Sequence, residues 1–410
     1  MTNLRFSRRI TYIFSALLFS YFIFSCNNSN CNNNKGVKGE KKNNSITSVK
    51  DTINEKVIQS ATDTSSYVNY YNDIARYIAG LPLNKSSKLY SLTLNKEWIN
   101  YQKQSDSLWM KIGDKRLNKI HIWTNKEMKD VVEGTKTLFY PFGGPDFLFS
   151  NIFFPNAEKY VLIGLENVGV VPDVRGFEKN SLGYYLGDIS KSIKDITQSS
   201  FFITNNMIKD LNKPDVRGTL PIIMLFVART GNQILDIKSF EINSQGNIEY
   251  LKNHKSGKSG RYGKGVEITF RKANTNQKRY IYYFPVDLSN KGLTNNPNSR
   301  MFIEKLDSGM TTYVKSASYL MHSSTFSEIR HIILSKSKYM LQDDSGIPYK
   351  FFDQKVWDLK LYGNYIKPIK PFNWCNQEDL RNAFKTKANP LPFNIGYGKI
   401  SNQFLLRKKG

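Results

Sequence analysis

The sequence predicts an α+β fold in which a helical N-terminal part packs on an antiparallel sheet and further helices follow in the C-terminal part. Three observations predict this fold. Apolar residues recur at helical spacing from about residue 67 to residue 134, and they alternate with polar residues between residues 233 and 288. Helical spacing then returns after residue 310. Helices on either side of a block of hairpins are typical of an α+β protein.

Three segments at the start of this region predict helices. Residues 67–82, YVNYYNDIARYIAGLP, place their apolar side chains on one face, and the helix should end at Gly80. Residues 86–112 again carry apolar residues at helical spacing, and Gly113 predicts the end of this second helix. Residues 125–134, NKEMKDVVEG, predict a third, short helix.

Strand signals follow. TKTLFYPFGG at 135–144 and KYVLIGLENVG at 159–169 predict two strands of a sheet. LPIIMLFVA at 220–228 is too short to cross a membrane, so it is predicted to lie in the core. ILDIKSFEINSQGNIEYL at 234–251 alternates and contains a turn, and residues 265–288 predict a second hairpin.

The C-terminal part predicts helices and then an irregular segment. TTYVKSASYLMHSS at 311–324 and FSEIRHIILSKSKYML at 326–341 predict helices. DDSGIPYKFF at 343–352 predicts a turn into a strand. The proline-rich sequence from Pro368 onward predicts a segment that wraps the surface.

The first 25 residues have the three parts of an export signal. Three arginines make a basic start, and residues 10–24 are a mostly apolar run, shorter than the roughly 20 residues of a spanning helix. The sequence therefore predicts a signal peptide at 1–25, a disordered polar tether at 26–65 and a single domain at 66–410. A division of that domain into two packed lobes near residue 215 is the alternative.

The residues around Cys26 resemble the lipobox of bacterial lipoproteins. Ile23 stands where leucine is usual and Ser25 at the small position, although Phe24 is bulkier than the usual residue. The resemblance implies cleavage before Cys26 and attachment of several acyl chains, which hold a protein durably at a membrane. An ordinary cleaved signal with an incidental cysteine, or an uncleaved anchor, is the alternative. Asn27, by analogy with lipoprotein sorting, favours the outer membrane.

The chain is strongly basic, with a formal net charge of +25. The three arginines of the signal account for a small part of this charge, so the mature chain stays basic. One interpretation is attraction to an anionic surface such as lipid headgroups or an envelope polymer. The other is an AT-rich genome, because lysine, asparagine and isoleucine are all abundant. Nucleic acid is not expected as a partner of an exported protein.

The sequence contains none of the common catalytic or metal-binding motifs, such as HExxH, CxxC or G-x-S-x-G. With only four histidines, a histidine-rich metal site is not expected, and neither a metal nor a cofactor is predicted. The few cysteines do not form a disulfide framework. A bridge between Cys31 and Cys375 is conceivable, but Cys375 is better interpreted as a small buried apolar residue.

The loop KNHKSGKSGRYGKG at 252–265 is a candidate anion-binding hairpin tip. It fails the spacing of a nucleotide-binding glycine loop. Its candidate binding residues are all basic: Lys252, Lys255, Lys258, Arg261 and Lys264. The alternative is an ordinary solvated loop.

A second set of candidate residues could be catalytic. On the predicted helix 311–324, three polar side chains recur at helical spacing: Lys315, Tyr319 and His322. If this helix meets the QDDSG turn, Asp343 or Asp344 could orient His322, with a nucleophile beside it, as in a hydrolase. The alternative is a helix with an ordinary polar face.

The aromatic segment YPFGGPDFLFSNIFFPN at 140–156 contains a single carboxylate, Asp146. Exposed aromatic rings stack on sugars, so Asp146 is a candidate glycan-binding residue. The alternative, which the density of aromatic residues favours, is a segment that fills the core around a tight turn.

YPFGGPDF, FFPNAEKYVLIGLENVG and LQDDSGIPYKFF resemble segments of a family of exported bacterial lipoproteins. The resemblance covers most of the chain after the tether. It implies no known activity, so no functional residue is transferred from it. The leading hypothesis is a lipid-anchored envelope protein that binds an anionic or glycan surface. The alternative is an envelope hydrolase that uses His322, Asp343 and Asp344.

Overall fold

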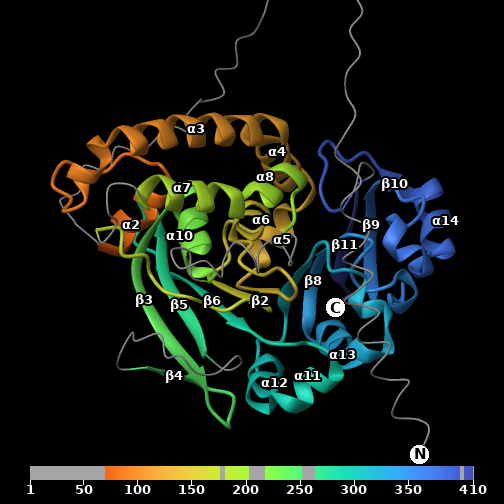
Figure 1. The fold of residues 1–410 in the computed structure, drawn as a ribbon. Helices are drawn as coiled ribbons and strands as arrows, with labels where there is room; N and C mark the ends of the chain where they lie inside the picture. Colours follow the sequence, from red (N-terminus) through yellow and green to blue (C-terminus); the bar gives the residue numbers. More distant parts are fainter. Residues whose placement is uncertain (1–69, 176–180, 203–217, 252–263, 398–400, 410) are drawn as a thin grey trace, which may run out of the picture. The chain divides into compact units, whose positions relative to one another are not determined.

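An eleven-stranded sheet runs through the described part of the chain (Figure 1). The computed structural model describes residues 70–175, 181–202, 218–251, 264–397 and 401–409. Residues 60–410 belong to one compact unit and residues 1–59 to another. The predicted signal peptide, the tether and Cys26 lie outside the described residues.

The strand order is β10-β9-β11-β8-β7-β1-β2-β6-β5-β3-β4. The central strands run parallel to one another: β6 (Arg279–Pro285), β2 (Lys159–Gly164), β1 (Thr137–Tyr140), β7 (Met310–Val314) and β8 (Ser337–Gln342). Antiparallel strands extend the sheet beyond β6: β5 (Lys264–Lys272), β3 (Asn232–Ile242) and β4 (Ile248–Tyr250). Beyond β8 lie β11 (Asn402–Lys408), which is antiparallel to both of its neighbours, then β9 (Trp357–Gly363) and β10 (Ala388–Asn389).

The predicted α+β fold is confirmed, and so are both hairpins. β3 and β4 join through a turn in which Gly246 takes the left-handed φ of +72° that glycine tolerates. β5 pairs with β6 as the second hairpin. The prediction that the C-terminal remainder from Pro368 onward wraps the surface is wrong, because it contributes β10 and β11 to the sheet. Phe404, Leu405 and Leu406 of β11 are fully buried.

Side chains of the sheet alternate between two apolar cores, one on each face. Leu138 and Tyr140 of β1 belong to one core, and Phe139 belongs to the other. The first core packs under these helices (Figure 1): α2 (Tyr70–Ile78), α3 (Lys96–Ile112), α4 (Asn118–Glu127), α5 (Lys129–Gly134), α6 (Phe147–Phe153), α7 (Ser181–Ser192), α8 (Lys194–Ser199) and α10 (Leu220–Arg229). The second core packs under α11 (Asn290–Asn295), α12 (Pro297–Glu304), α13 (Ser327–Lys336) and α14 (Glu378–Lys387).

The apolar run at 220–228 lies in the core as predicted, as the buried helix α10. In the described residues, no helix is both long enough and apolar enough to cross a membrane.

The helix predicted to end at Gly113 continues past it. Gly113 keeps helical dihedral angles, φ −54° and ψ −60°, and a π-helical turn at Gly113–Leu117 joins α3 directly to α4. A π turn inserts one extra residue into a helix and is often found beside a functional site. Here the inserted turn contains the buried Arg116.

The helix predicted at 311–324 is also wrong. The first part of this segment is strand β7, and the second is a loop with a short 3-10 turn, Leu320–His322. All five residues of β7 are buried, so the strand shows no alternation that would separate it from a helix. The loop contains left-handed φ angles at Ser316, Ser318 and Tyr319, which a continuous helix excludes.

The order of the parallel strands reverses at β1. The chain leaves β1 toward β2 on one side, and it leaves β7 toward β8 on the other side. β1 and β7 are neighbours, so their outgoing loops diverge. In open sheets of this kind, ligands bind outside the carboxyl ends of the strands near such a reversal.

Candidate functional site

Ionisable residues follow the ends of four adjacent parallel strands. Glu166 follows β2, Asp146 follows β1, Lys315 follows β7, and Asp343 and Asp344 follow β8. Parallel strands end at the same edge, so all five residues gather at the carboxyl edge of the sheet. The sequence analysis singled out four of them but placed them on separate elements.

Asp146 and Lys315 form an ion pair in the interior. Lys315 Nζ lies 2.8 Å from Asp146 Oδ2, and the two side chains are 1% and 2% exposed. Asp146 also caps helix α6 by accepting a hydrogen bond from the Phe149 N–H at 3.0 Å. The Tyr140 hydroxyl donates to the same carboxylate at 3.0 Å. The carboxylate is therefore held from three directions.

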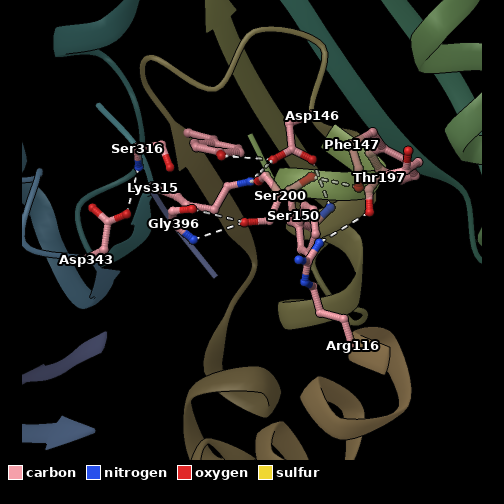
Figure 2. Close-up of polar contacts among 12 residues, drawn as sticks. Arg116, Asp146, Phe147, Ser150, Thr197, Ser200, Lys315, Ser316, Asp343 and Gly396 are labelled. Carbon is pink, nitrogen blue, oxygen red and sulfur yellow. Dashed lines mark hydrogen bonds and ion pairs between the residues drawn. The ribbon is translucent and has the colours of Figure 1, made fainter. Parts of the chain in front are cut away.

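The loop that follows α8 covers this ion pair. Lys315 Nζ donates to the Ser200 carbonyl oxygen, and the Ser200 hydroxyl accepts a hydrogen bond from the Gly396 N–H at 3.0 Å. Figure 2 shows Lys315 between Asp146 and Ser200, with Arg116 approaching the same loop from the π turn. The Arg116 guanidinium donates to the carbonyl oxygens of Thr197 and Gln198 at 3.5 and 3.3 Å.

Burial lowers the pKa of Lys315, and the charge of Asp146 opposes this shift. The ammonium group also lies 4.1 Å from the centre of the Phe149 ring, a cation–π distance. Because the two charges pair with each other and both side chains are almost fully buried, the Asp146–Lys315 pair is closed to solvent. The interpretation of Asp146 as an exposed glycan-binding residue is wrong, since Phe147, Phe149 and Phe153 around it are fully buried.

Among the described residues, only main-chain and hydroxyl donors hold Asp343. The Ser316 N–H donates to one carboxylate oxygen at 2.8 Å, and the Ser345 N–H donates to the other at 3.1 Å. The Ser345 hydroxyl donates to that second oxygen as well. No lysine or arginine of the described residues forms an ion pair with Asp343.

Asp344 is held by side chains of two other segments. The Tyr319 hydroxyl donates to one carboxylate oxygen, and Asn402 Nδ2 donates to the other at 2.9 Å. The Asn402 side chain also accepts from the Asp344 N–H at 2.8 Å. Asn402 opens strand β11, so the C-terminal strand fixes the turn after β8.

A small cavity of about 30 Å³ lies beside these two carboxylates. Its volume is that of roughly one water molecule. It is lined by Tyr319, Asp343, Asp344, Asn364, Tyr365, Ile366, Lys367, Ile369, Ile395, Gly396, Tyr397 and Asn402. The residues from 364 to 369 follow β9, which runs in the same direction as β8, so the cavity lies at the same edge of the sheet.

The carboxylates beside the cavity hold their protons more tightly than free aspartates. Burial, and next the charge of Asp344, raises the pKa of Asp343 to about 7. Burial also raises the pKa of Asp344, against the hydrogen bonds from Tyr319 and Asn402. Burial likewise raises the pKa of Glu166, whose described hydrogen-bond donor is the Leu165 N–H at 3.1 Å.

The candidate hydrolase residues gather in one place but not as a catalytic set. Tyr319 packs against His322 with ring centres 5.2 Å apart, and its hydroxyl already donates to Asp344. Burial lowers the pKa of His322 to about 4, and its Nε2 has no partner in the described residues. The buried Ser345 hydroxyl donates to Asp343 rather than to a histidine. A nucleophile activated by a histidine base is therefore not assembled here.

The basic loop lies mostly outside the described residues. Lys252, Lys255, Lys258 and Arg261 belong to that part, and Lys264 begins β5 with its Nζ 3.2 Å from Glu241. Cys375 is buried beside Tyr319 and Phe372. Cys31, its conceivable partner, also lies outside the described residues.

Several residues of the site were missed by the sequence analysis: Arg116, Tyr140, Glu166, Ser200, Gly396, Tyr397 and Asn402. Most lie tens of residues from their partners, so no local pattern identifies them. Glu166 is different, because an acid directly after the apolar run VLIGL could have been recognised as a strand-end residue.

In the described ranges, no group of three or more histidine, cysteine or acidic side chains could hold a metal ion. Comparison of the sequence with protein-family models, with curated proteins and with solved structures finds no match. A functional conclusion about the folded body therefore rests on the chemistry of the carboxyl edge.

Proposed function

We propose that the protein is a lipid-anchored protein of the cell envelope, most simply of the outer membrane, whose folded body binds a glycan at the cavity beside Asp343 and Asp344. The anchor is supported by the lipobox-like residues around Cys26. The observation that carries the binding site is the cavity itself. It combines a strand-end position, the buried Asp343 and half-buried Asp344 carboxylates, amide side chains and tyrosine rings.

The lining chemistry favours a hydroxyl-bearing ligand over an anion. Carboxylates accept hydrogen bonds from hydroxyl groups, and amides such as those of Asn364 and Asn402 both accept and donate them. Two neighbouring acids repel a phosphate or a carboxylate. Because the cavity has the volume of about one water molecule, a single hydroxyl or hydroxymethyl group would enter it. The remaining sugar would lie on the rim against Ile366, whose side chain is 47% exposed.

Saturation-transfer NMR with the purified full-length protein and neutral trisaccharides, such as chitotriose and maltotriose, tests this site. Asn364 is exposed on the rim, so we expect Asn364→Ala to weaken binding about tenfold, the loss of one or two hydrogen bonds, without unfolding the protein. Asn125→Ala, at an exposed position on α4, is the matched control and should bind as the wild type. Equal binding by both variants would place the sugar elsewhere.

A second candidate function, an envelope hydrolase, is favoured by one observation. The pKa of Asp343, raised to about 7 by burial and by Asp344, suits a general acid or base near neutral pH. In this proposal Asp343 and Asp344, not His322, would move the protons. Release of reducing ends from oligosaccharides by the wild type, lost in Asp343→Asn, would support it. If the protein binds oligosaccharides but releases no reducing ends, it is a binding protein and the hydrolase proposal is contradicted.

Mass spectrometry of the mature N-terminus tests the anchor. We expect cleavage before Cys26 and the mass of acyl chains on that residue. An unmodified terminus at another position would contradict the lipoprotein proposal and leave the glycan site untouched.

A further inference from the structure

The long helix formed by α3, the π turn and α4 has an outer face with apolar side chains in one row. Ile99, Met110 and Ile122 are 37%, 59% and 68% exposed. Ile99 and Met110 are 11 residues apart, which is about three helical turns. Met110 and Ile122 are 12 residues apart, and the extra residue of the intervening π turn keeps Ile122 on the same side.

The opposite face of the same helix is anchored in the protein. Trp98, Tyr101, Trp109, Ile120 and Trp123 are buried in the first core. These side chains fix the rotation of the helix about its axis. The apolar row therefore points outward because of the packing, not because the helix end is loose.

Lysines flank the apolar row. The exposed lysines of the helix are Lys96, Lys103, Lys111, Lys115, Lys119 and Lys126. The exposed acids are fewer: Glu97, Asp106 and Asp114. Asp106 is already neutralised by Arg229, whose Nη1 lies 2.8 Å from it. The outer face is therefore both apolar and positively charged.

We propose that this outer face of α3 and α4 docks on the anionic lipid headgroups of the membrane that carries the Cys26 anchor. The proposal rests on the lipid anchor of the proposed function. Apolar side chains in a row with flanking lysines are the composition of helices that lie in a membrane interface. Each lysine near an anionic surface contributes about 1 kcal/mol of attraction.

The place where the chain enters the described unit supports this occupant. The predicted tether joins Cys26 to Tyr70, the first residue of α2, and a flexible coil of that length spans roughly 35–40 Å. α2 packs directly against α3. Trp98 Nε1 donates to the Tyr77 carbonyl oxygen at 3.1 Å, and the Tyr101 hydroxyl donates to the Ile78 carbonyl oxygen at 2.5 Å. The chain therefore enters the described unit at α2, directly beside α3.

A fluorescent label on the helix tests the docking in the full-length lipidated protein. Asn118 is exposed on the outer face between Met110 and Ile122, so Asn118→Cys accepts a polarity-sensitive NBD label in a Cys31→Ser background. Cys375 should stay unlabelled, because burial raises the pKa of its thiol to about 12. The labelled protein is placed in nanodiscs of phosphatidylcholine alone or of phosphatidylcholine with phosphatidylglycerol.

We expect NBD emission to rise about twofold and to shift to shorter wavelength only in nanodiscs that contain phosphatidylglycerol. Adding ~0.5 M salt should restore the original intensity and wavelength, because salt screens the attraction between lysines and lipid. Asn382→Cys, exposed on α14 at the other face of the sheet, is the control label and should not respond. Lys111→Glu together with Lys119→Glu should abolish the rise. Lys385→Glu together with Lys387→Glu, on α14, should leave it unchanged.

The outcomes separate docking from anchoring. Protein that fails to co-elute with either nanodisc contradicts the lipid anchor. Co-elution with no change in emission overturns the docking and leaves the anchor intact. A rise that follows protein concentration, whatever the lipid, would show that a second copy of the chain covers the helix and would overturn the proposal.

Discussion

Two buried acidic sites lie at neighbouring strand ends of the same sheet edge, and they are built in opposite ways. Asp146 faces a lysine at 2.8 Å and is sealed by the Ser200 loop. Asp343 faces a second acid, is held by neutral donors, and borders a cavity. Both are nearly inaccessible, so exposure alone does not distinguish them.

The difference shows what makes a buried charge available for function. A carboxylate neutralised by a cation is a structural element, because opening the pair strands two charges in a low-dielectric interior. A carboxylate held by neutral donors beside an acid is costly when ionised, and its pKa rises toward neutral. Perturbed acids of this second kind gather at functional sites. The comparison therefore supports the proposed ligand site at Asp343 and Asp344, and it gives Asp146 and Lys315 a role in stability.

The largest effect should come from breaking the sealed pair. Lys315→Met leaves the Asp146 carboxylate buried without its cation, so we expect a loss of about 3–5 kcal/mol in the free energy of unfolding. Lys136→Met is the control. Its Nζ also lies 2.8 Å from a carboxylate, that of Glu158, but the two side chains are 71% and 40% exposed. Urea titration should give less than about 1 kcal/mol for this exposed pair.

Adding Asp146→Asn to Lys315→Met sharpens this result. If the cost comes from a stranded charge, the double variant should lose less than the sum of the single variants. Equal losses for Lys315→Met and Lys136→Met would mean that burial does not decide the role of the pair.

The second effect is a dependence of stability on pH. Burial raises the pKa of Asp343 in the folded protein to about 7, from an ordinary value of 3.8, so its contribution to the free energy of unfolding is full below pH 3.8 and is lost as pH rises through 7. The pKa of His322 is lowered to about 4 from 6.5. The contribution of His322 to the free energy of unfolding is therefore full above pH 6.5 and is lost as pH falls through 4. The two slopes oppose each other between pH 4 and 6.5.

Single variants should separate these slopes. In the Asp343→Asn variant, the free energy of unfolding should increase by about 1.4 kcal/mol per pH unit between pH 4 and 6.5, because only the opposing slope of His322 remains. His322→Gln should make it less stable with rising pH over the same range. The measurement is urea unfolding at several pH values, with Lys136→Met as a variant whose slope should match the wild type. Parallel curves for all four proteins would show that neither group is perturbed.

The third effect comes from the support of Asp344. Tyr319→Phe removes the hydroxyl that donates to this half-buried carboxylate, and we expect a loss of about 2 kcal/mol in the free energy of unfolding because the acceptor is a charged group. Tyr349→Phe is the control, since the hydrogen bond that the Tyr349 hydroxyl makes in the described part of the chain is accepted from the exposed Gln354 amide at 3.2 Å. Thermal unfolding should show a shift for the first variant and almost none for the second. Equal shifts would mean that the Tyr319 ring, not its hydroxyl, supports the site.

The sequence predicted the elements better than their assembly. The hairpins β3–β4 and β5–β6 were predictable because each strand alternates and each turn is local. The parallel direction of the central strands was not, because strands buried on both faces read as continuous apolar runs, such as VLIG in β2. β7 was taken for a helix for the same reason.

The candidate site was predicted in its residues but not in its geometry. The sequence identified Lys315, Tyr319, Asp343 and Asp344 as candidates. The ion pair, however, joins Lys315 to Asp146, 169 positions away, and no local sequence pattern connects residues so far apart. Strand ends offer a usable signal. An ionisable residue directly after an apolar run occurs at Lys315 and Asp343, and such positions share one edge of a parallel sheet.

The smallest effect on stability tests the cavity itself. Gly396 has a φ of +80°, and a Cβ there would lie 2.8 Å from Asp343 Oδ2. Gly309 has a similar φ of +93°, but no atom lies within 4 Å of an added Cβ. Both glycine-to-alanine substitutions carry a backbone strain of about 1 kcal/mol. The extra contact at Gly396 pushes against Asp343 and narrows the cavity. We therefore expect trisaccharide binding to fall in Gly396→Ala and to persist in Gly309→Ala, because the two variants share strain and differ only in the contact. Binding that survives in both would remove the cavity from the proposed site, and binding lost in both would show that backbone strain alone controls it.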